Sequence, residues 1–205
     1  MLDLQPAARE VIRLLDGVRD DQLSDPTPNR GTSVGALLDH FMSLTAAFTA
    51  AARKTSGGGS PPPAPSADNL PADWRRRLIG RLRALAEAWQ DPAAWDGTTQ
   101  AGGVTSAADE IGLVALDELV LHGWDLAKAT GQPFTVTPAS EAAVLGFTEA
   151  TAEPGAEAMR EGLFGPVVAV PPGAPPFDRA LGFAGRDPAW SPRSVDREAR
   201  SDKTS

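Results

Sequence analysis

The sequence predicts an all-α protein, built on a bundle of four helices and followed by an irregular C-terminal segment. Three observations support this fold class. Apolar residues recur at helical spacing in four long segments, the apolar content comes mainly from Ala, Leu and Val, and loops rich in Gly and Pro separate the segments. A chain of 205 residues is long enough for one substantial core, so a single domain is expected.

Two helices joined by a loop account for the first quarter of the chain. The first predicted helix covers residues 6–19, and residues 20–32 form a loop because they hold two prolines and a glycine among polar residues. Ser33 is a suitable N-cap for a second helix that runs to about Lys54. His40 lies at the edge of the apolar stripe of this helix and therefore borders the predicted core.

A Gly- and Pro-rich connection separates the second helix from the third. Residues 55–65 read Thr-Ser-Gly-Gly-Gly-Ser-Pro-Pro-Pro-Ala-Pro, and we expect residues 55–70 to form an exposed linker. The third helix covers residues 72–89 and is stopped by Pro92. Residues 95–106 contain three glycines and several threonines, which predicts an irregular loop.

The fourth helix, residues 107–130, is apolar over a wide arc, which predicts that it is buried. Gly131 is a candidate C-cap for it. A fifth helix runs to about Thr151, with Thr137 as its N-cap and Pro138 at its first position.

The helical period fades after residue 154. Residues 159–192, the C-terminal strap, are rich in Gly and Pro, with a helical turn at residues 177–183. We expect the strap to pack over the bundle. Residues 193–205 are polar and charged, which predicts a disordered tail. The predicted domain therefore spans residues 1–192.

Composition and charge exclude several classes of partner. The net charge is −8 and the largest basic cluster is Arg75-Arg76-Arg77, so we expect neither nucleic acid nor an anionic membrane as a partner. The chain has no cysteine, which removes disulfides, thiolate ligands and cysteine nucleophiles. Its N-terminus lacks the basic region of a signal peptide, and no apolar run approaches about 18 residues. A cytoplasmic protein is therefore expected.

The strongest chemical signal is a Glu-x-x-x-His pair on the fourth helix. Glu118 and His122 stand four residues apart, so a carboxylate and an imidazole project from the same face. His40, the other histidine of the chain, lies on the second helix. These three residues would form an open metal site, with a fourth position left for water or substrate, as catalytic divalent ions require. Zinc is the first choice, and nickel or iron can use the same donors.

Other acidic residues lie near these ligands in the sequence. Asp125 is a candidate to orient His122 by a hydrogen bond, and an equal alternative is that it satisfies nearby backbone groups or caps a neighbouring helix. Asp39 and Asp117 point elsewhere on their helices, so we expect them at the surface or paired with loops. The alternative for the triad is a buried polar cluster without metal. The sequence assigns no catalytic residue.

Three segments of the chain resemble those of a known family. They read Ala94-Trp-Asp-Gly-Thr-Thr-Gln-Ala-Gly-Gly103, Glu118-Leu-Val-Leu-His-Gly-Trp-Asp-Leu-Ala-Lys-Ala-Thr-Gly-Gln132, and Phe164-Gly-Pro166 leading to Leu181-Gly-Phe-Ala-Gly-Arg-Asp-Pro188. The chain resembles the DinB-like superfamily and, within it, the mycothiol-dependent maleylpyruvate isomerase N-terminal group, most closely an actinobacterial family of uncharacterised metal-binding proteins. The resemblance implies an up-down-down-up bundle in which His40, Glu118 and His122 bind a metal.

The loop before the second helix departs from the pattern of this group. That segment usually reads Thr-Pro-Cys followed by a Trp-Thr-Val pattern, whereas here Thr27-Pro-Asn-Arg-Gly-Thr-Ser-Val34 has neither Cys nor Trp. The difference affects the local packing and a wall of the substrate pocket, and leaves the ligand positions unchanged.

The resemblance also implies an enzyme whose sulfur nucleophile comes from a small-molecule thiol cofactor. Mycothiol would bind the metal as a thiolate and add to a small electrophilic substrate, in an isomerase or S-transferase reaction. The absence of cysteine is compatible with this reading. Two alternatives stay open, a hydrolase or lyase that uses metal-bound hydroxide and a metal-binding bundle without catalysis. A homodimer of paired bundles is compatible with the fold.

Overall fold

The computed structural model describes residues 1–55 and 63–192 and confirms the all-α class. Its helices are α1 (Gln5–Asp16), α2 (Val34–Ala52), α3 (Trp74–Ala88), α4 (Ala108–Thr130), α5 (Pro138–Thr151), α6 (Glu157–Arg160) and α7 (Pro176–Phe183), with 3-10 turns at Asp20–Gln22, Ala67–Asn69 and Pro92–Trp95. Two short strands, β1 (Thr98–Ala101) and β2 (Val104–Ala107), precede α4. Residues 56–62 of the expected linker and the disordered tail expected at 193–205 lie outside the described residues.

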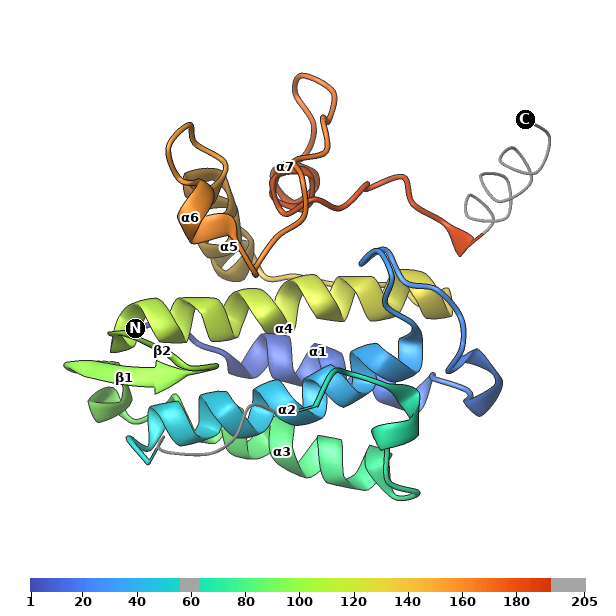
Figure 1. Ribbon diagram of the computed structural model, residues 1–205, viewed down its shortest axis with the longest axis horizontal. Coiled ribbons are helices and arrows are strands. Elements are labelled where there is room, and N and C mark those ends of the chain that lie inside the picture. Colours follow the sequence, from blue (N-terminus) through green and yellow to red (C-terminus); the bar gives the residue numbers. More distant parts are fainter. Residues whose placement is uncertain (56–62, 193–205) are drawn as a thin grey trace.

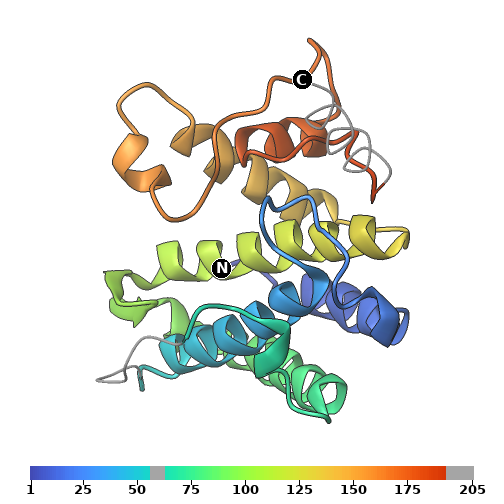
Figure 2. The same cartoon turned by 45° about the vertical axis from the view of Figure 1, so that its right-hand side comes forward.

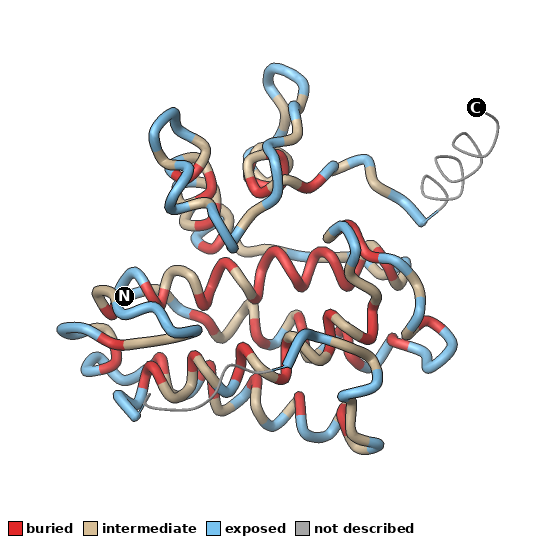
Figure 3. The backbone as a smooth tube through the Cα atoms, in the orientation of Figure 1, coloured by how far each residue is buried: buried red, intermediate tan, exposed pale blue. Residues whose placement is uncertain are grey.

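Helix α4 lies between two layers of helices. Helices α1, α2 and α3 lie on one side of it, and α5, α6 and α7 lie on the other (Figures 1 and 2). Figure 3 shows that α4 is buried along most of its length. This position explains why α4 is apolar on nearly every face, and it encloses the polar residues that α4 carries.

The caps confirm the predicted ends of three helices. At the start of α2, the Ser33 hydroxyl accepts a hydrogen bond from the Ala36 amide at 3.2 Å. Thr137 accepts one from the Ser140 amide at 3.2 Å and so caps α5. Gly131 has a φ of +69° and ends α4 in the left-handed conformation that glycine adopts without strain.

The prediction of an irregular loop at residues 95–106 is wrong, because this stretch forms a β-hairpin. Strands β1 and β2 pair in antiparallel fashion across Gly102 and Gly103, whose φ angles are +58° and +84°. A two-residue hairpin turn with positive φ at both positions favours Gly-Gly. The Thr99 hydroxyl donates to the Ala51 carbonyl at 2.7 Å, so the hairpin is tied to the end of α2.

The described part of the predicted linker is anchored to α2. The Ser66 amide and the Asn69 side chain donate hydrogen bonds to the Asp39 carboxylate at 3.1 and 2.8 Å. These bonds confirm that Asp39 pairs with a loop. They also hold the turn at Ala67–Asn69 against α2, although residues 63–65 stay exposed.

The C-terminal strap lies on the far side of α4, where it packs mainly against α5 and reaches α4 through Arg186, which bonds to Asp125 (Figure 1). The predicted turn at residues 177–183 is α7, which packs against α5. Arg179 on α7 pairs with Glu149 on α5 at 2.8 Å. Within the strap, the Val168 amide donates to the Gly182 carbonyl at 2.9 Å.

Helix α2 meets the length and hydropathy of a membrane span, alone among the helices of the described residues. In the fold, 56% of that window is buried against other parts of the chain, as is usual for a core helix.

Two helical glycines should respond to alanine with opposite signs. A Cβ on Gly35, near the start of α2, would lie 2.5 Å from the Cβ of Ala67 and 3.0 Å from the Leu23 carbonyl oxygen. Gly35→Ala should therefore lower the free energy of unfolding by about 1–3 kcal/mol. Gly80 in α3 is exposed and a Cβ there would meet no atom within 4 Å. Gly80→Ala should raise the free energy of unfolding by about 0.5–1 kcal/mol. Urea unfolding measures both, and stabilisation by both changes would contradict the close contact at α2.

Candidate metal centre

Two helices bring the three predicted ligands into one cluster. His40 lies on α2 and the other two residues lie on α4, which packs against α2. One carboxylate oxygen of Glu118, Oε2, lies 3.1 Å from Nε2 of His40 and 3.1 Å from Nε2 of His122. One donor atom from each residue lies within 4.8 Å of the others. The cluster therefore offers two nitrogens and one oxygen around a common point.

The donor set suits one divalent ion. Nitrogen and oxygen ligands bind zinc at about 2.0–2.2 Å in tetrahedral geometry, which separates neighbouring donors by roughly 3.3 Å. The Glu118 oxygen lies at nearly this separation from each imidazole nitrogen. Three protein donors leave a fourth position free, which is the pattern of a catalytic site rather than a structural one.

Asp125 holds His122 from the other side of the ring. The Asp125 Oδ2 atom lies 3.0 Å from Nδ1 of His122, and Nη2 of Arg186 donates to the same oxygen at 3.0 Å. When Nδ1 carries the proton, Nε2 is left with its lone pair directed at the cluster. Asp125 thus selects the tautomer of His122 that a metal would require.

Burial and charge act in opposite directions on these groups. Burial alone would lower the pKa of His122, but hydrogen bonds to Asp125 and Glu118 raise that pKa to about 9. Burial would raise the pKa of Glu118, yet hydrogen bonds from His122 and His40 hold it below its usual range. Both shifts favour an ionised Glu118 beside a protonated His122 when no metal is bound, and a metal that binds there would displace that proton.

A cavity of about 530 Å³ lies beside the cluster. All three cluster residues and Arg186 contribute to its wall. The rest of the wall comes from the loop before α2, the α2 surface, the connection between α2 and α3, and the strap: Asn29, Gly31, Thr32, Ala36, Leu37, Pro65, Gly162, Leu163 and Phe164. The loop that departs from the family pattern thus lines this cavity, and a small molecule inside it would reach the cluster.

The prediction that Asp117 lies at the surface or pairs with a loop is wrong. Its side chain is buried, with 4% of the residue exposed, and its Oδ1 atom has no hydrogen-bond partner among the described residues. The reason is that α4 is covered on both sides, so a residue that turns away from α2 meets the second layer of helices. Burial, and then the charge of Glu118, raises the pKa of Asp117 well above its usual range.

Arg186 is the residue at this site that sequence reasoning missed. It is 5% exposed and binds Asp125 from the end of the strap, 61 positions further along the chain. Its segment, Gly-Arg-Asp-Pro, is among those that resemble the family. The resemblance marks the segment but assigns no function to Arg186. No spacing rule connects a loop arginine to a helix so distant in sequence.

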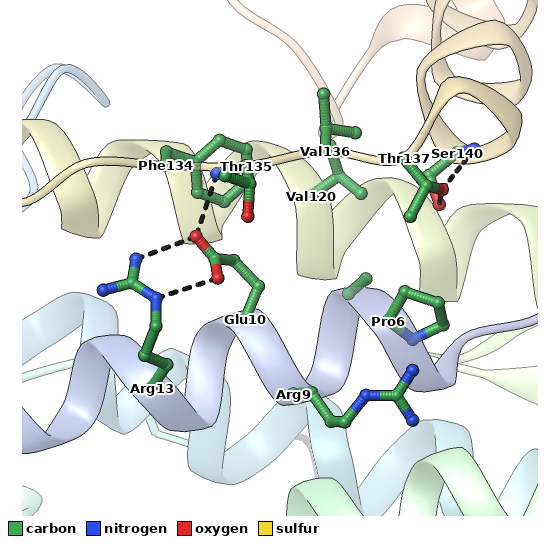
Figure 4. A pocket seen from close by; sticks show the side chains of 11 residues that line it. Pro6, Arg9, Glu10, Arg13, Val120, Phe134, Thr135, Val136, Thr137 and Ser140 are labelled. Carbon is green, nitrogen blue, oxygen red and sulfur yellow. Dashed lines mark hydrogen bonds and ion pairs between the residues drawn. The ribbon is translucent and has the colours of Figure 1, made fainter.

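A second cavity, of about 360 Å³, lies between α1 and the connection from α4 to α5. In Figure 4 the Glu10 carboxylate faces Arg13 and the Thr135 amide, and other residues of the wall, such as Phe134 and Val120, are apolar. Glu10 pairs with Arg13 within α1 at 2.8 Å, and the Thr135 amide donates to Glu10 at 2.9 Å, which ties α1 to this connection. None of the three cluster residues lines this cavity.

Comparisons with known proteins identify a family and a structure with a similar fold. Residues 4–127 match the family model described as the mycothiol maleylpyruvate isomerase N-terminal domain. A similar solved structure is a crystal structure of a histidine-to-alanine mutant of the mycothiol-dependent maleylpyruvate isomerase, with a TM-score of 0.56 and 16% identity over 71% of this chain. The match covers 66% of that protein, slightly less than two thirds of its length. The two proteins share a fold over the matched region. Curated protein sequences give no match. Since the family model covers more than half of the chain, from α1 through most of α4, the protein belongs to the mycothiol maleylpyruvate isomerase N-terminal domain family.

Proposed function

We propose that the protein binds one divalent metal through His40, Glu118 and His122 and serves as a mycothiol-dependent isomerase or S-transferase. Zinc is the proposed ion, and nickel or iron suits the same donors. The observation that carries the proposal is the convergence of two Nε2 atoms on one Glu118 oxygen, with Nδ1 of His122 bound by Asp125. One partly buried Glu and two His are a donor set that metals use, and the adjacent cavity gives a ligand access to it.

Two observations, the composition of the chain and its family, support mycothiol as the proposed cofactor. A divalent ion lowers the pKa of a thiol that it binds, so that the thiolate is available near neutral pH. The chain has no cysteine of its own, so a sulfur nucleophile has to come from a small molecule. The family to which the chain belongs is named for mycothiol.

The residues of the chain have separate tasks in this scheme. Asp125 keeps the proton on Nδ1 of His122 and so keeps Nε2 available. Half-buried His40 stands at the open side of the cluster, with 33% of its side chain exposed, whereas His122 shows 10%. A ligand therefore approaches past His40. The loop before α2 and residues 162–164 of the strap enclose it and limit its contact with water.

Cobalt substitution tests the thiol claim. Addition of mycothiol to the cobalt-loaded protein should produce a new sulfur-to-cobalt absorption band, because the open position accepts the thiolate. S-methyl mycothiol, which cannot form a thiolate, is the matched control and should give no band. If the thiol leaves the spectrum unchanged while generic esters are hydrolysed without it, the protein is a metal-dependent hydrolase. If nothing competes for the site and metal removal lowers the melting temperature sharply, the ion is structural.

A further inference from the structure

Arg186 joins the C-terminal strap to the proposed metal centre. The residue lies three positions beyond the end of α7 and outside residues 4–127, which match the family model. Only 5% of it is exposed, and its guanidinium faces α4 rather than solvent. A charged side chain is rarely buried to this degree unless it is paired, so its contacts indicate what holds it there.

Each donor group of the Arg186 side chain that has a contact is directed at a specific acceptor. Nη2 donates to Asp125 Oδ2 at 3.0 Å, and Nε faces the other carboxylate oxygen, Oδ1, at 3.4 Å. Nη1 donates to the Ala184 carbonyl at 2.9 Å, which fixes the guanidinium relative to its own backbone. The arginine therefore meets the carboxylate with two adjacent donors, an arrangement that restrains the plane of the Asp125 side chain.

The same carboxylate oxygen that binds Arg186 also binds His122. Asp125 Oδ2 lies 3.0 Å from Nδ1 of His122 and 3.0 Å from Nη2 of Arg186. Asp125 has no exposed surface, so water cannot replace Arg186 as its partner without an opening of the strap. The position of the His122 ring thus depends on a side chain from the strap.

We propose that Arg186 is a positioning residue of the metal centre: by holding the Asp125 carboxylate, it fixes the orientation and tautomer of His122 and links docking of the strap to metal affinity. This inference rests on the proposed function. Residues 162–164 and Arg186 line the cavity beside the cluster, so the strap that closes the cavity also supports the ligand. In this arrangement, docking of the strap both completes the cavity wall and fixes the orientation of His122 on α4.

Zinc affinity of full-length variants tests the role of Arg186. Arg186→Met keeps the length of the side chain and removes its charge and donors, and it should weaken zinc binding by about 10–100-fold, the range for loss of a partner behind a ligand. Arg186→Lys keeps the charge without the paired donors and should fall between Arg186→Met and wild type. Arg179→Met, on the same strap, removes the pair with Glu149 and should leave zinc affinity unchanged. Competition with a chromophoric chelator gives the dissociation constants.

The cobalt spectrum separates positioning from general loss of structure. Circular dichroism first establishes that each metal-free variant is folded. A folded Arg186→Met protein should bind cobalt with shifted visible bands, because the imidazole is no longer held in one orientation, whereas Arg179→Met should show the wild-type spectrum. If Arg186→Met does not fold, Arg186→Lys carries the test, and zinc affinity and a cobalt spectrum equal to those of wild type would overturn the proposal.

A double-mutant cycle tests whether Arg186 acts through Asp125. Coupled residues show non-additive effects, so the weakening caused by Arg186→Met should largely disappear in an Asp125→Asn background. An equal fold-change in both backgrounds would show that Arg186 acts by another route and would overturn the inference. Wild-type protein that binds no zinc would instead contradict the proposed function. Wild-type protein that binds zinc, with Arg186 variants of equal affinity, contradicts this inference alone.

Discussion

Alanine in place of His122 should remove stoichiometric metal from the protein. Wild type should carry about one equivalent, and His122→Ala should carry almost none, because two donors on separate helices are too few to hold a divalent ion against buffer and chelators. His40→Ala should give the same result from the other helix. Elemental analysis of untagged protein, after reconstitution with zinc and gel filtration, measures the ratio directly.

Asp39→Asn is the matched control for the histidine variants. Asp39 is the neighbour of His40 in sequence, but its carboxylate accepts hydrogen bonds from Ser66 and Asn69 and is not among the three clustered donors. This variant should therefore keep its metal. Retention of one equivalent by both histidine variants would mean that the ion binds elsewhere. A wild-type protein that stays empty after reconstitution would make the triad a buried polar cluster.

The helices of this protein could be predicted because the sequence marks both the apolar face of each helix and the residues at its ends. Ser33 and Thr137 stand immediately before α2 and α5 and cap them, and Gly131 follows α4 with positive φ. These are local effects, decided by residues within one turn of each other. The hairpin before α4 is also encoded locally, by Gly102 and Gly103 between two short segments that contain Thr and Val, but the same residues are equally common in irregular loops.

The cluster was predictable for a different reason. Glu118 and His122 share a helix face by their spacing, and the chain contains a single further histidine, so few combinations were available. His40 reaches Glu118 and His122 only because α2 packs on α4. The position of His40 at the edge of the apolar stripe of α2 indicated this packing. The surroundings of the cluster were not predictable in this way. Whether Asp117 is buried depends on the layer beyond α4, and the contact of Arg186 with Asp125 depends on the path of the strap.

Loss of the Trp89 side chain should cause the largest loss of stability of any change considered. Trp89 is 1% exposed at the end of α3, and its indole N–H donates to the Phe48 carbonyl on α2 at 3.1 Å. Its ring meets that of Trp95 edge to face at 4.9 Å, and the Trp95 indole donates to the Trp89 carbonyl at 2.8 Å. The two rings pack over Gly112 of α4, where a Cβ would lie 2.8 Å from the Trp89 ring. One side chain therefore joins α2, α3 and α4.

Trp89→Ala should lower the free energy of unfolding by about 3–5 kcal/mol, through the cavity that it leaves and the contacts that it removes. For a chain of this size each kcal/mol shifts the melting temperature by roughly 2–4 °C, so a decrease of about 6–20 °C is expected in calorimetry. Trp89→Phe keeps an aromatic ring without the indole donor and should lose less. Because none of the three clustered donors belongs to this aromatic group, folded Trp89→Ala protein should keep its equivalent of zinc at low temperature. A melting temperature equal to that of wild type would show that the three helices are held together without this contact, whereas loss of zinc from the folded variant would show that the helix packing and the metal centre depend on each other.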